Sequence, residues 1–237
     1  MSKEIARDKK GYYTIDKIPH VSVTTFLKVI NKAFLYGWNG RMEQKGVLHL
    51  IRRLKKKDKS SQEILKKVKK YVKRSTTAAE RYTFKRGAAG NVIHKAIDHY
   101  LRTGKKATIK NKIHRKAFHN FLKWWETAGY KVIKSEQGVS DKKLRVAGTI
   151  DVYLLRIKDK AKGIGDWKTG KGIYLESHLQ NVTYRHLARK EFPSTFGIIV
   201  HVPQDGGKIK VYEVDTKKYP LKMALCALEL YRYLYES

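Results

Sequence analysis

The chain has 237 residues, of which 41% are hydrophobic and 11% aromatic, so it can bury a sizeable core and is not expected to be disordered. Its 53 Lys and Arg residues against 21 Asp and Glu give a formal net charge of +32. Such a charge attracts polyanions, with nucleic acid the first candidate and an anionic membrane surface the second. A merely solvated basic surface is the remaining interpretation.

The cysteine content and the hydropathy of the sequence exclude several further classes of protein. Cys226 is the single cysteine, which excludes a disulfide within the chain and a thiolate-held iron–sulfur cluster. No segment approaches the roughly 18 apolar residues of a membrane span, and residues 1–10 have no apolar run. We therefore expect a protein that is not secreted, does not bind membranes and acts in the cytoplasm, which is the host's if the source is a virus.

Residues 1–85 are predicted to form an N-terminal, mainly helical and basic region. A short strand at residues 12–15 precedes a helix that begins near Phe26. Ser60 and Glu63 form a capping box that starts an amphipathic helix whose polar face is nearly all lysine. This face is either solvated or contacts a DNA backbone. The candidate nucleic-acid-binding residues on it are Lys66, Lys67, Lys69, Lys70, Lys73 and Arg74.

Residues 86–237 are predicted to form an α/β core. A capping box at Thr77 and Glu80 begins a helix that reaches about Leu101, with a break possible near its glycines. The order that follows is a helix, three strands, a helix, two strands and a terminal helix, which favours one mixed sheet flanked by helices. The segments are a helix around residues 118–125, strands 131–139, 144–156 and 163–168, a helix from Ser177 to Glu191, strands 196–202 and 208–214, and a helix from Tyr219.

Asp151 lies in the middle of a strand, residues 146–155, that is apolar on both faces. Such a strand is central and buried. A buried carboxylate is costly unless it has a partner, which is either a metal cation or a structural salt bridge.

The next strand carries Asp166 and Lys168, whose side chains share one face because they are two residues apart. If this strand lies beside that of Asp151, two carboxylates and an ammonium group converge. Two carboxylates bind a hard cation such as Mg²⁺ or Mn²⁺, and the lysine holds a phosphate oxygen or positions the attacking water. This combination indicates metal-assisted phosphodiester hydrolysis.

Two helical positions are further candidates. His94 faces the same way as Ile97 and Leu101, so it is either a core residue or a third metal ligand. Gln180 and Tyr184 are four residues apart and share a helix face, which is either ordinary surface or a contact with DNA or the site.

Together these residues resemble the PD-(D/E)xK nuclease superfamily. The RecB-like branch is the most similar, with its Cas4 nucleases, phage exonucleases and mitochondrial genome maintenance exonuclease. The resemblance spans about residues 17–190 and rests on the order of the blocks, since none is specific alone. The blocks are Pro19 to Thr25, Gly90-x-x-x-His94, Glu136, Gly148-Thr149-Ile150-Asp151, Asp166-Trp167-Lys168-Thr169 and Gln180-x-x-x-Tyr184.

The resemblance implies a restriction-endonuclease-like core, a Mg²⁺ or Mn²⁺ cofactor and a role for each block. Lys168 would be the catalytic lysine, and Glu136 would support the site or a second metal. Gln180 and Tyr184 would stabilise the site or guide the DNA. The implied metal ligands are His94, Asp151, Asp166 and the backbone carbonyl of Trp167. The cysteines of typical Cas4 proteins are absent, so no iron–sulfur cluster is expected.

The leading hypothesis is therefore a metal-dependent DNA exonuclease from a virus or mobile element. It would cut single-stranded DNA or DNA ends in replication, recombination or repair, with proteins of those processes as partners. A structure-specific endonuclease on the same fold is the first alternative. A non-catalytic DNA-binding protein is the second, and its binding would need no metal.

Overall fold

A computed structural model describes residues 7–30, 34–74 and 76–236, with only the backbone described for residues 34–36. The chain divides into two compact units. The helical unit comprises residues 31–88, and the sheet unit comprises residues 1–30 and 89–237. The sequence had placed all of residues 1–85 in one helical region, whereas the structure assigns the first 30 residues to the sheet unit.

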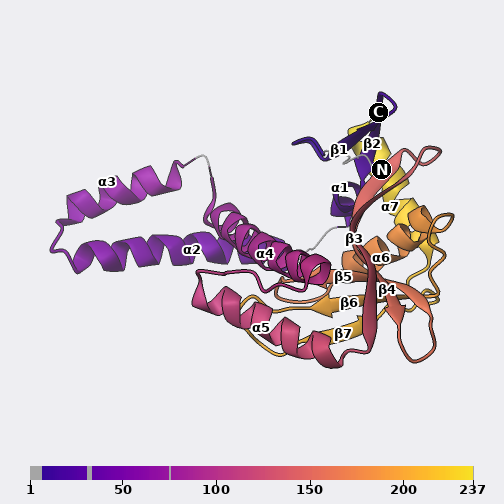
Figure 1. The fold of residues 1–237 in the computed structure, drawn as a ribbon. Helices are drawn as coiled ribbons and strands as arrows, with labels where there is room; N and C mark the ends of the chain where they lie inside the picture. The colour runs from indigo at the N-terminus through magenta and orange to yellow at the C-terminus, as the bar shows by residue number, and fades with distance from the viewer. Residues whose placement is uncertain (1–6, 31–33, 75, 237) are drawn as a thin grey trace. The chain divides into compact units, whose positions relative to one another are not determined.

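The helical unit contains α2 (Phe34–Lys55), α3 (Ser61–Val72) and the first part of α4 (Ala78–Thr103) (Figure 1). Both capping boxes are confirmed, because the Ser60 and Thr77 hydroxyls accept hydrogen bonds from the backbone of Glu63 and Glu80. The separate long helix α2 was not expected from the sequence.

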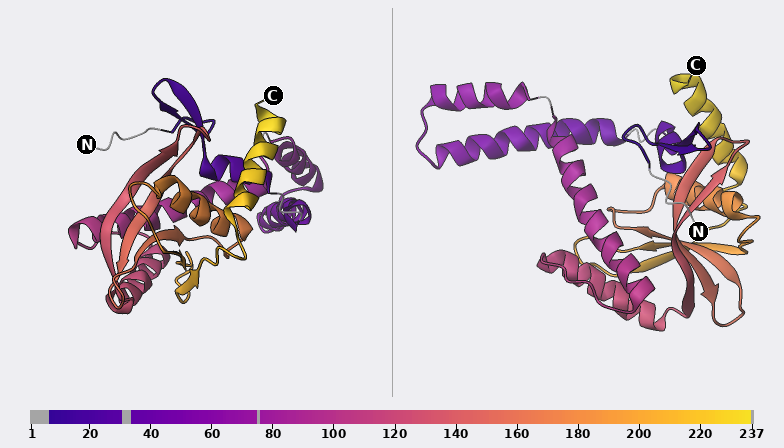
Figure 2. Two further views of the ribbon diagram at one scale, coloured as in Figure 1. Left: turned by 90° about the vertical axis from the view of Figure 1, so that its right-hand side faces the viewer. Right: turned by 45° about the horizontal axis from the view of Figure 1, so that its top comes forward.

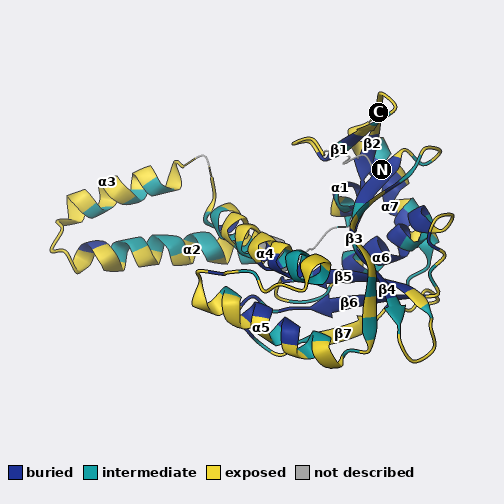
Figure 3. Cartoon of the chain, in the orientation of Figure 1, coloured by how far each residue is buried: buried dark blue, intermediate teal, exposed yellow. Residues whose placement is uncertain are grey.

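The two helices α2 and α3 pack through a glycine. A Cβ atom at Gly46 of α2 would overlap the hydroxyl of Tyr71 of α3, so only glycine permits this approach. Arg81 donates a hydrogen bond to the same hydroxyl at 2.8 Å, and Trp38 packs edge-on against Tyr82. Even so, α3 contains no buried residue, and Figure 3 shows it mainly exposed.

The sheet unit is built on a mixed sheet of seven strands, which confirms the predicted α/β class. Its order is β1-β2-β4-β5-β6-β7, and β3 pairs with β4 off this path. β1 and β2, which were not expected in the sheet, add a hairpin whose second strand runs parallel to β4. The bounds are β1 (Tyr12–Ile15), β2 (Ile18–Ser22), β3 (Tyr130–Asp141), β4 (Val146–Arg156), β5 (Lys162–Lys168), β6 (Phe196–His201) and β7 (Lys210–Glu213).

Helices cover the sheet on both sides (Figure 2). One core cluster joins the strands to α1 (Val23–Phe26), the 3₁₀ helix η1 (Leu27–Val29), α6 (Leu175–Ala188) and α7 (Leu221–Tyr235). The other joins them to the second part of α4 and to α5 (Lys112–Thr127). Within the described part of the chain, none of the helices combines the length and apolarity that a membrane crossing needs.

Two local predictions about helices were wrong. Ser177 does not cap α6, because the helix begins at Leu175 with Tyr174 as its N-cap, and Ser177 is buried in the first turn. α4 is not broken at Gly87 or Gly90 but continues through both glycines. A helix tolerates an interior glycine at a cost of about 1 kcal/mol relative to alanine, which packing elsewhere along the helix offsets.

Strands β4 and β5 separate at one end of their pairing, and this separation positions the candidate site. One edge of β4 pairs with β3 along its whole length, so β2 and β5 share the other edge. β2 pairs with Val146 and Ala147, while β5 pairs with β4 only as far as Val152 opposite Gly165. The next two residues, Asp151 and Asp166, do not pair with each other, although Asp166 still pairs with Ile199 of β6. The strands therefore diverge where the two carboxylates begin.

Candidate active site

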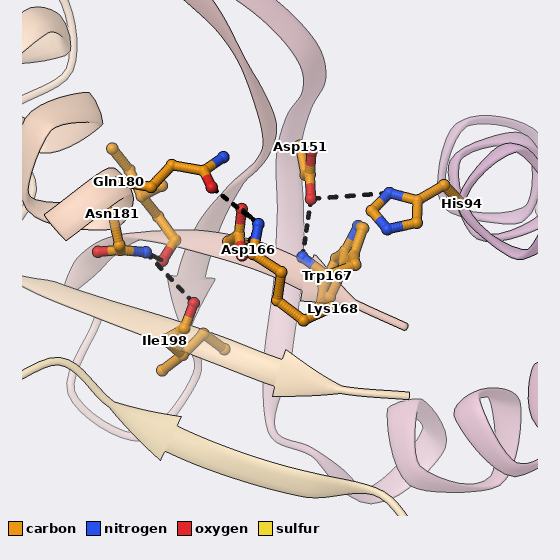
Figure 4. Close-up of polar contacts among 9 residues, drawn as sticks. His94, Asp151, Asp166, Trp167, Lys168, Gln180, Asn181 and Ile198 are labelled. Carbon is orange, nitrogen blue, oxygen red and sulfur yellow. Dashed lines mark hydrogen bonds and ion pairs between the residues drawn. The ribbon is translucent and has the colours of Figure 1, made fainter. Parts of the chain in front are cut away.

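Lys168 connects two of the predicted residues. Its Nζ atom donates hydrogen bonds to Asp166 Oδ1 at 2.8 Å and to Gln180 Oε1 at 2.9 Å (Figure 4). Asp166 is 2% exposed, so its charge is almost completely removed from water. The two-residue spacing thus predicted correctly that Asp166 and Lys168 share a face, and α6 supplies the third group from above that face.

Asp151 lies on the other branch of the opened sheet. Its Oδ2 atom accepts a hydrogen bond of 2.7 Å from the backbone nitrogen of Trp167, which replaces the missing ladder bond. His94 Nδ1 lies 3.9 Å from the same oxygen (Figure 4). No lysine or arginine in the described ranges forms an ion pair with Asp151, so the salt-bridge alternative is not supported there.

Trp167 fixes the strand between the two aspartates. Its side chain is 1% exposed and packs edge-on against Phe121 of α5, with ring centroids 5.3 Å apart. Because alternate residues of a strand point to opposite faces, this packing turns Asp166 and Lys168 toward α6. The tryptophan therefore acts on the site through its packing and its backbone.

Glu136 lies opposite Asp151, between the pairs Ser135–Val152 and Gln137–Ile150. Its φ of 49° is in the left-handed region, which costs a non-glycine residue of order 1 kcal/mol or more and is concentrated at functional sites. The pKa of Glu136 is raised to about 7, mainly by desolvation and in addition by the nearby carboxylates of Asp151 and Asp98.

Burial also raises the pKa of both aspartates. The pKa of Asp166 is raised to about 6, although the Lys168 ammonium opposes the shift. The pKa of Asp151 is raised for the same reason and is opposed by the same lysine. Burial lowers the pKa of His94, and Lys168 lowers it further. The site thus holds three carboxyl groups whose ionisation one ammonium does not fully compensate, which favours the binding of another cation.

A hard divalent cation fits these groups. Asp166 Oδ2 is buried and accepts no hydrogen bond, although the Lys168 nitrogen lies 2.8 Å away. In the described part of the chain, no three His, Cys, Asp or Glu side chains are already gathered at metal-binding distances. Mg²⁺ does not require such a cage, because it is commonly held by one or two carboxylates together with waters and substrate phosphates.

Gln180 and Tyr184 are buried, which contradicts the alternative that they form ordinary helix surface. Tyr184 lies directly on Gly148, where a Cβ atom would come within 2.6 Å of its ring. Gly90 similarly allows α4 to approach the Thr169 hydroxyl, which would lie 2.6 Å from a Cβ atom. The glycines of two predicted blocks therefore serve close packing around the site.

The side chains predicted for the site line one pocket of about 440 Å³, with Trp167 contributing its backbone beneath. The remaining lining residues, for which the sequence predicted no role in the site, are Arg7, Tyr13, Thr24, Asn91, Lys95 and Thr149. Asp98, which was also not predicted, accepts a hydrogen bond from Ser135 and pairs with Arg102. Asp98 follows His94 by four residues, and this helical spacing was the available signal.

The six predicted nucleic-acid-binding residues lie in the helical unit. Lys66, Lys67, Lys69, Lys70, Lys73 and Arg74 are all exposed. None of them forms an ion pair with a described residue, since Glu63 pairs with Lys59 instead. The ring of Tyr71 lies against the guanidinium groups of Arg74 and Arg81.

Comparisons with known proteins leave the family open. No family model matches the chain, and no curated protein matches it. Among solved structures, a crystal structure of SSO0001 matches with a TM-score of 0.30 and 16% sequence identity. The match covers 49% of this chain and 57% of that one, so the chain spans little more than half the length of that protein.

Proposed function

We propose that the protein is a Mg²⁺- or Mn²⁺-dependent deoxyribonuclease, most simply an exonuclease, of the RecB-like branch of the PD-(D/E)xK superfamily. One observation carries the proposal. Asp151, Asp166 and Lys168 meet where two strands diverge, and Gln180 and His94 reach the same pocket from two separate helices. A purely structural carboxylate pair would not need an open pocket, a strained glutamate and a lysine held by a third residue.

In this proposal, Asp151 and Asp166 would hold the cation with the backbone carbonyl of Trp167, and His94 would complete the set. A bound divalent cation lowers the pKa of a water ligand and withdraws charge from the phosphate. The water oxygen would bond to phosphorus and release its proton to solvent, while the bond to the leaving sugar oxygen would break and that oxygen would take up a proton from solvent. Lys168 would exchange its contact with Asp166 for a phosphate oxygen and stabilise the charge that develops there.

Gln180 and Tyr184 act by positioning. The 2.9 Å hydrogen bond to Gln180 directs the Lys168 ammonium along the pocket. Burial raises the pKa of Tyr184, and the carboxylates of Asp151 and Asp166 raise it further, so the phenol stays protonated and can donate a hydrogen bond. Glu136 supports the site beside Asp151.

DNA is proposed as the substrate because the chain also carries a dense cationic surface. The helical unit contains 18 Lys and Arg residues against four acidic ones. Exposed lysines without acidic partners bind phosphates and release counterions, which is the main source of sequence-independent affinity for DNA. We assign this role to six basic residues, of which four lie in α3 and two, Lys73 and Arg74, directly follow it.

A non-catalytic DNA-binding protein is the second candidate. It is favoured by the absence of a gathered three-ligand cluster among the described residues. It predicts DNA binding that is sensitive to salt and indifferent to divalent cations.

A cleavage assay separates these candidates. End-labelled linear single-stranded and duplex DNA and closed circular DNA are incubated with Mg²⁺, Mn²⁺ or EDTA. Wild type is compared with Asp151→Asn, Lys168→Met and Lys123→Gln, the last being an exposed lysine of α5 outside the pocket. Metal-dependent loss of linear DNA supports the exonuclease proposal if Asp151→Asn and Lys168→Met each abolish it and Lys123→Gln does not. Cutting of circles indicates an endonuclease, whereas binding without cutting under any metal contradicts the proposal.

A further inference from the structure

The pocket contains cations that the proposed chemistry does not use. Helix α4 presents Asn91, His94 and Lys95 at spacings of three and four residues, so these side chains lie along one stripe. Asn91 and Lys95 are exposed, line the pocket and form no hydrogen bond or ion pair with any described residue. Their polar groups are therefore available to a ligand in the pocket.

A third unused group comes from the N-terminal segment. Arg7 Nη2 donates a hydrogen bond of 2.7 Å to Thr25 Oγ1, and Ser22 Oγ donates to the same oxygen at 2.8 Å. Ser22 also caps α1. This anchor engages one of the five N–H donors of the Arg7 guanidinium, while the exposed side chain also lines the pocket. The Ser-Val-Thr-Thr segment thus has a physical role, which is to hold Arg7 and to bring Thr24 to the pocket wall.

The cations that the proposed chemistry does not use lie on other elements than the carboxylates. The sheet strands contribute Glu136, Asp151 and Asp166 together with Lys168, whereas Lys95 and Arg7 come from α4 and from the segment before β1. A nucleic-acid strand carries successive phosphates, of which one would be at the carboxylates with the cation. The next phosphate would have no partner in the proposed chemistry and would need a separate cationic group.

We propose that Lys95 and Arg7, assisted by Asn91, form a second phosphate-binding subsite that holds the phosphate next to the cleaved one. These are positioning residues for a single strand, and the subsite binds sugar–phosphate rather than base. The inference rests on the proposed nuclease function, and it adds that efficient substrates carry at least two consecutive phosphodiesters.

Lys95 gives the cleaner test, because Arg7 also has a structural hydrogen bond. A short single-stranded oligonucleotide is compared with one in which the phosphate beside the cleaved linkage is a neutral methylphosphonate. On the natural strand, Lys95→Gln is expected to raise KM roughly tenfold with kcat unchanged, as expected for a lost charge-assisted contact. On the methylphosphonate strand the same substitution should have no effect. Lys95→Arg should restore the natural KM, and Lys123→Gln should match wild type on both strands.

A purely structural role for Lys95 would not make the effect of the substitution depend on the charge of the phosphate beside the cleaved linkage. Equal losses on both strands, or no loss on either, would overturn the subsite. If wild type cuts neither strand with Mg²⁺ or Mn²⁺, the nuclease proposal fails and the subsite is decided by binding in EDTA. In that case, Lys95→Gln must lower the slope of log Kd against log salt concentration by about one relative to Lys123→Gln, and an unchanged slope would refute it.

Discussion

The two units of this chain use charge in opposite ways. In the sheet unit, Asp166 is 2% exposed and its oxygens face one lysine, which a glutamine holds in turn. In the helical unit, α3 has no buried residue and its lysines have no acidic partners among the described residues. The interaction energy of a buried charge depends strongly on its position. The contributions of exposed charges add up and are screened by salt. We therefore propose that the first unit carries the chemistry and that the second binds a polyanion.

The strongest way to test this division is to remove the half-buried ammonium of Lys168. Lys168→Met should lower the single-turnover cleavage rate about 10²- to 10³-fold, because the charge that develops on the phosphate loses its stabilising group. The affinity for DNA should change less than threefold, since many other cations remain. Quenched-flow kinetics and fluorescence anisotropy measure the two quantities. A parallel loss of affinity would mean that Lys168 mainly binds DNA.

The reciprocal experiment removes exposed charge. Replacing Lys66, Lys67, Lys69 and Lys70 by glutamine should weaken DNA binding about 10²-fold at moderate salt and lower the salt slope by about three. The cleavage rate of bound DNA should stay within twofold of wild type. A cleavage rate that falls with affinity would show that these lysines affect the chemistry, and the division of roles would then be incorrect.

Two carboxyl groups of the sheet unit should make the stability of the protein depend on pH. The folded-state pKa of Asp166 is raised to about 6 and that of Glu136 to about 7. Groups with raised folded pKa values stabilise the fold below their unfolded pKa and lose that contribution as pH rises through the folded value. Without divalent cations, the free energy of unfolding should therefore fall by on the order of 2 kcal/mol between pH 4 and pH 7.

Denaturant titrations of wild type, Asp166→Asn and Glu136→Gln measure this effect. Either substitution should flatten the pH profile, and added Mg²⁺ should restore stability near pH 7 by binding the ionised carboxylates. A wild-type profile that rises over this range would contradict the raised pKa values of the two carboxyl groups.

Alanine substitutions at two glycines, one in each unit, should give the smallest difference, which is a difference in folding stability. Gly148→Ala in the sheet unit places a methyl group 2.6 Å from the Tyr184 ring and should destabilise the fold by about 1–3 kcal/mol. Gly87→Ala in the helical unit meets nothing within 4 Å and should stabilise α4 by up to about 1 kcal/mol. Thermal unfolding measures both, and equal shifts would show that packing around Tyr184 does not depend on Gly148.

The sequence predicted those parts of the site that follow from short-range spacing. Asp166 and Lys168 share a face because strands alternate, and Gln180 and Tyr184 share a face because helices repeat near four residues. The mixed sheet followed from the order of its elements. These inferences need only local geometry, and the structure confirms them.

Features that depend on tertiary contacts were not predictable from these patterns. β4 diverges from β5 at Asp151, and the same edge of β4 pairs further along with β2, which comes from the distant residues 18–22. Arg7 reaches the pocket because Thr25 anchors it, and nothing in the spacing of Arg7 indicates this. Likewise the left-handed backbone of Glu136 reflects its position opposite Asp151 and has no signature in its neighbours.

Anomalous diffraction from crystals grown with Mn²⁺ and a non-cleavable phosphorothioate oligonucleotide would locate the proposed cation. We expect an anomalous peak in contact with carboxylate oxygens of both Asp151 and Asp166 and with an oxygen of the strand's phosphate. Lys168 should then lie against that phosphate, because the cation replaces it beside Asp166. A phosphate seated in the pocket with no peak at the two aspartates would contradict the metal-dependent mechanism.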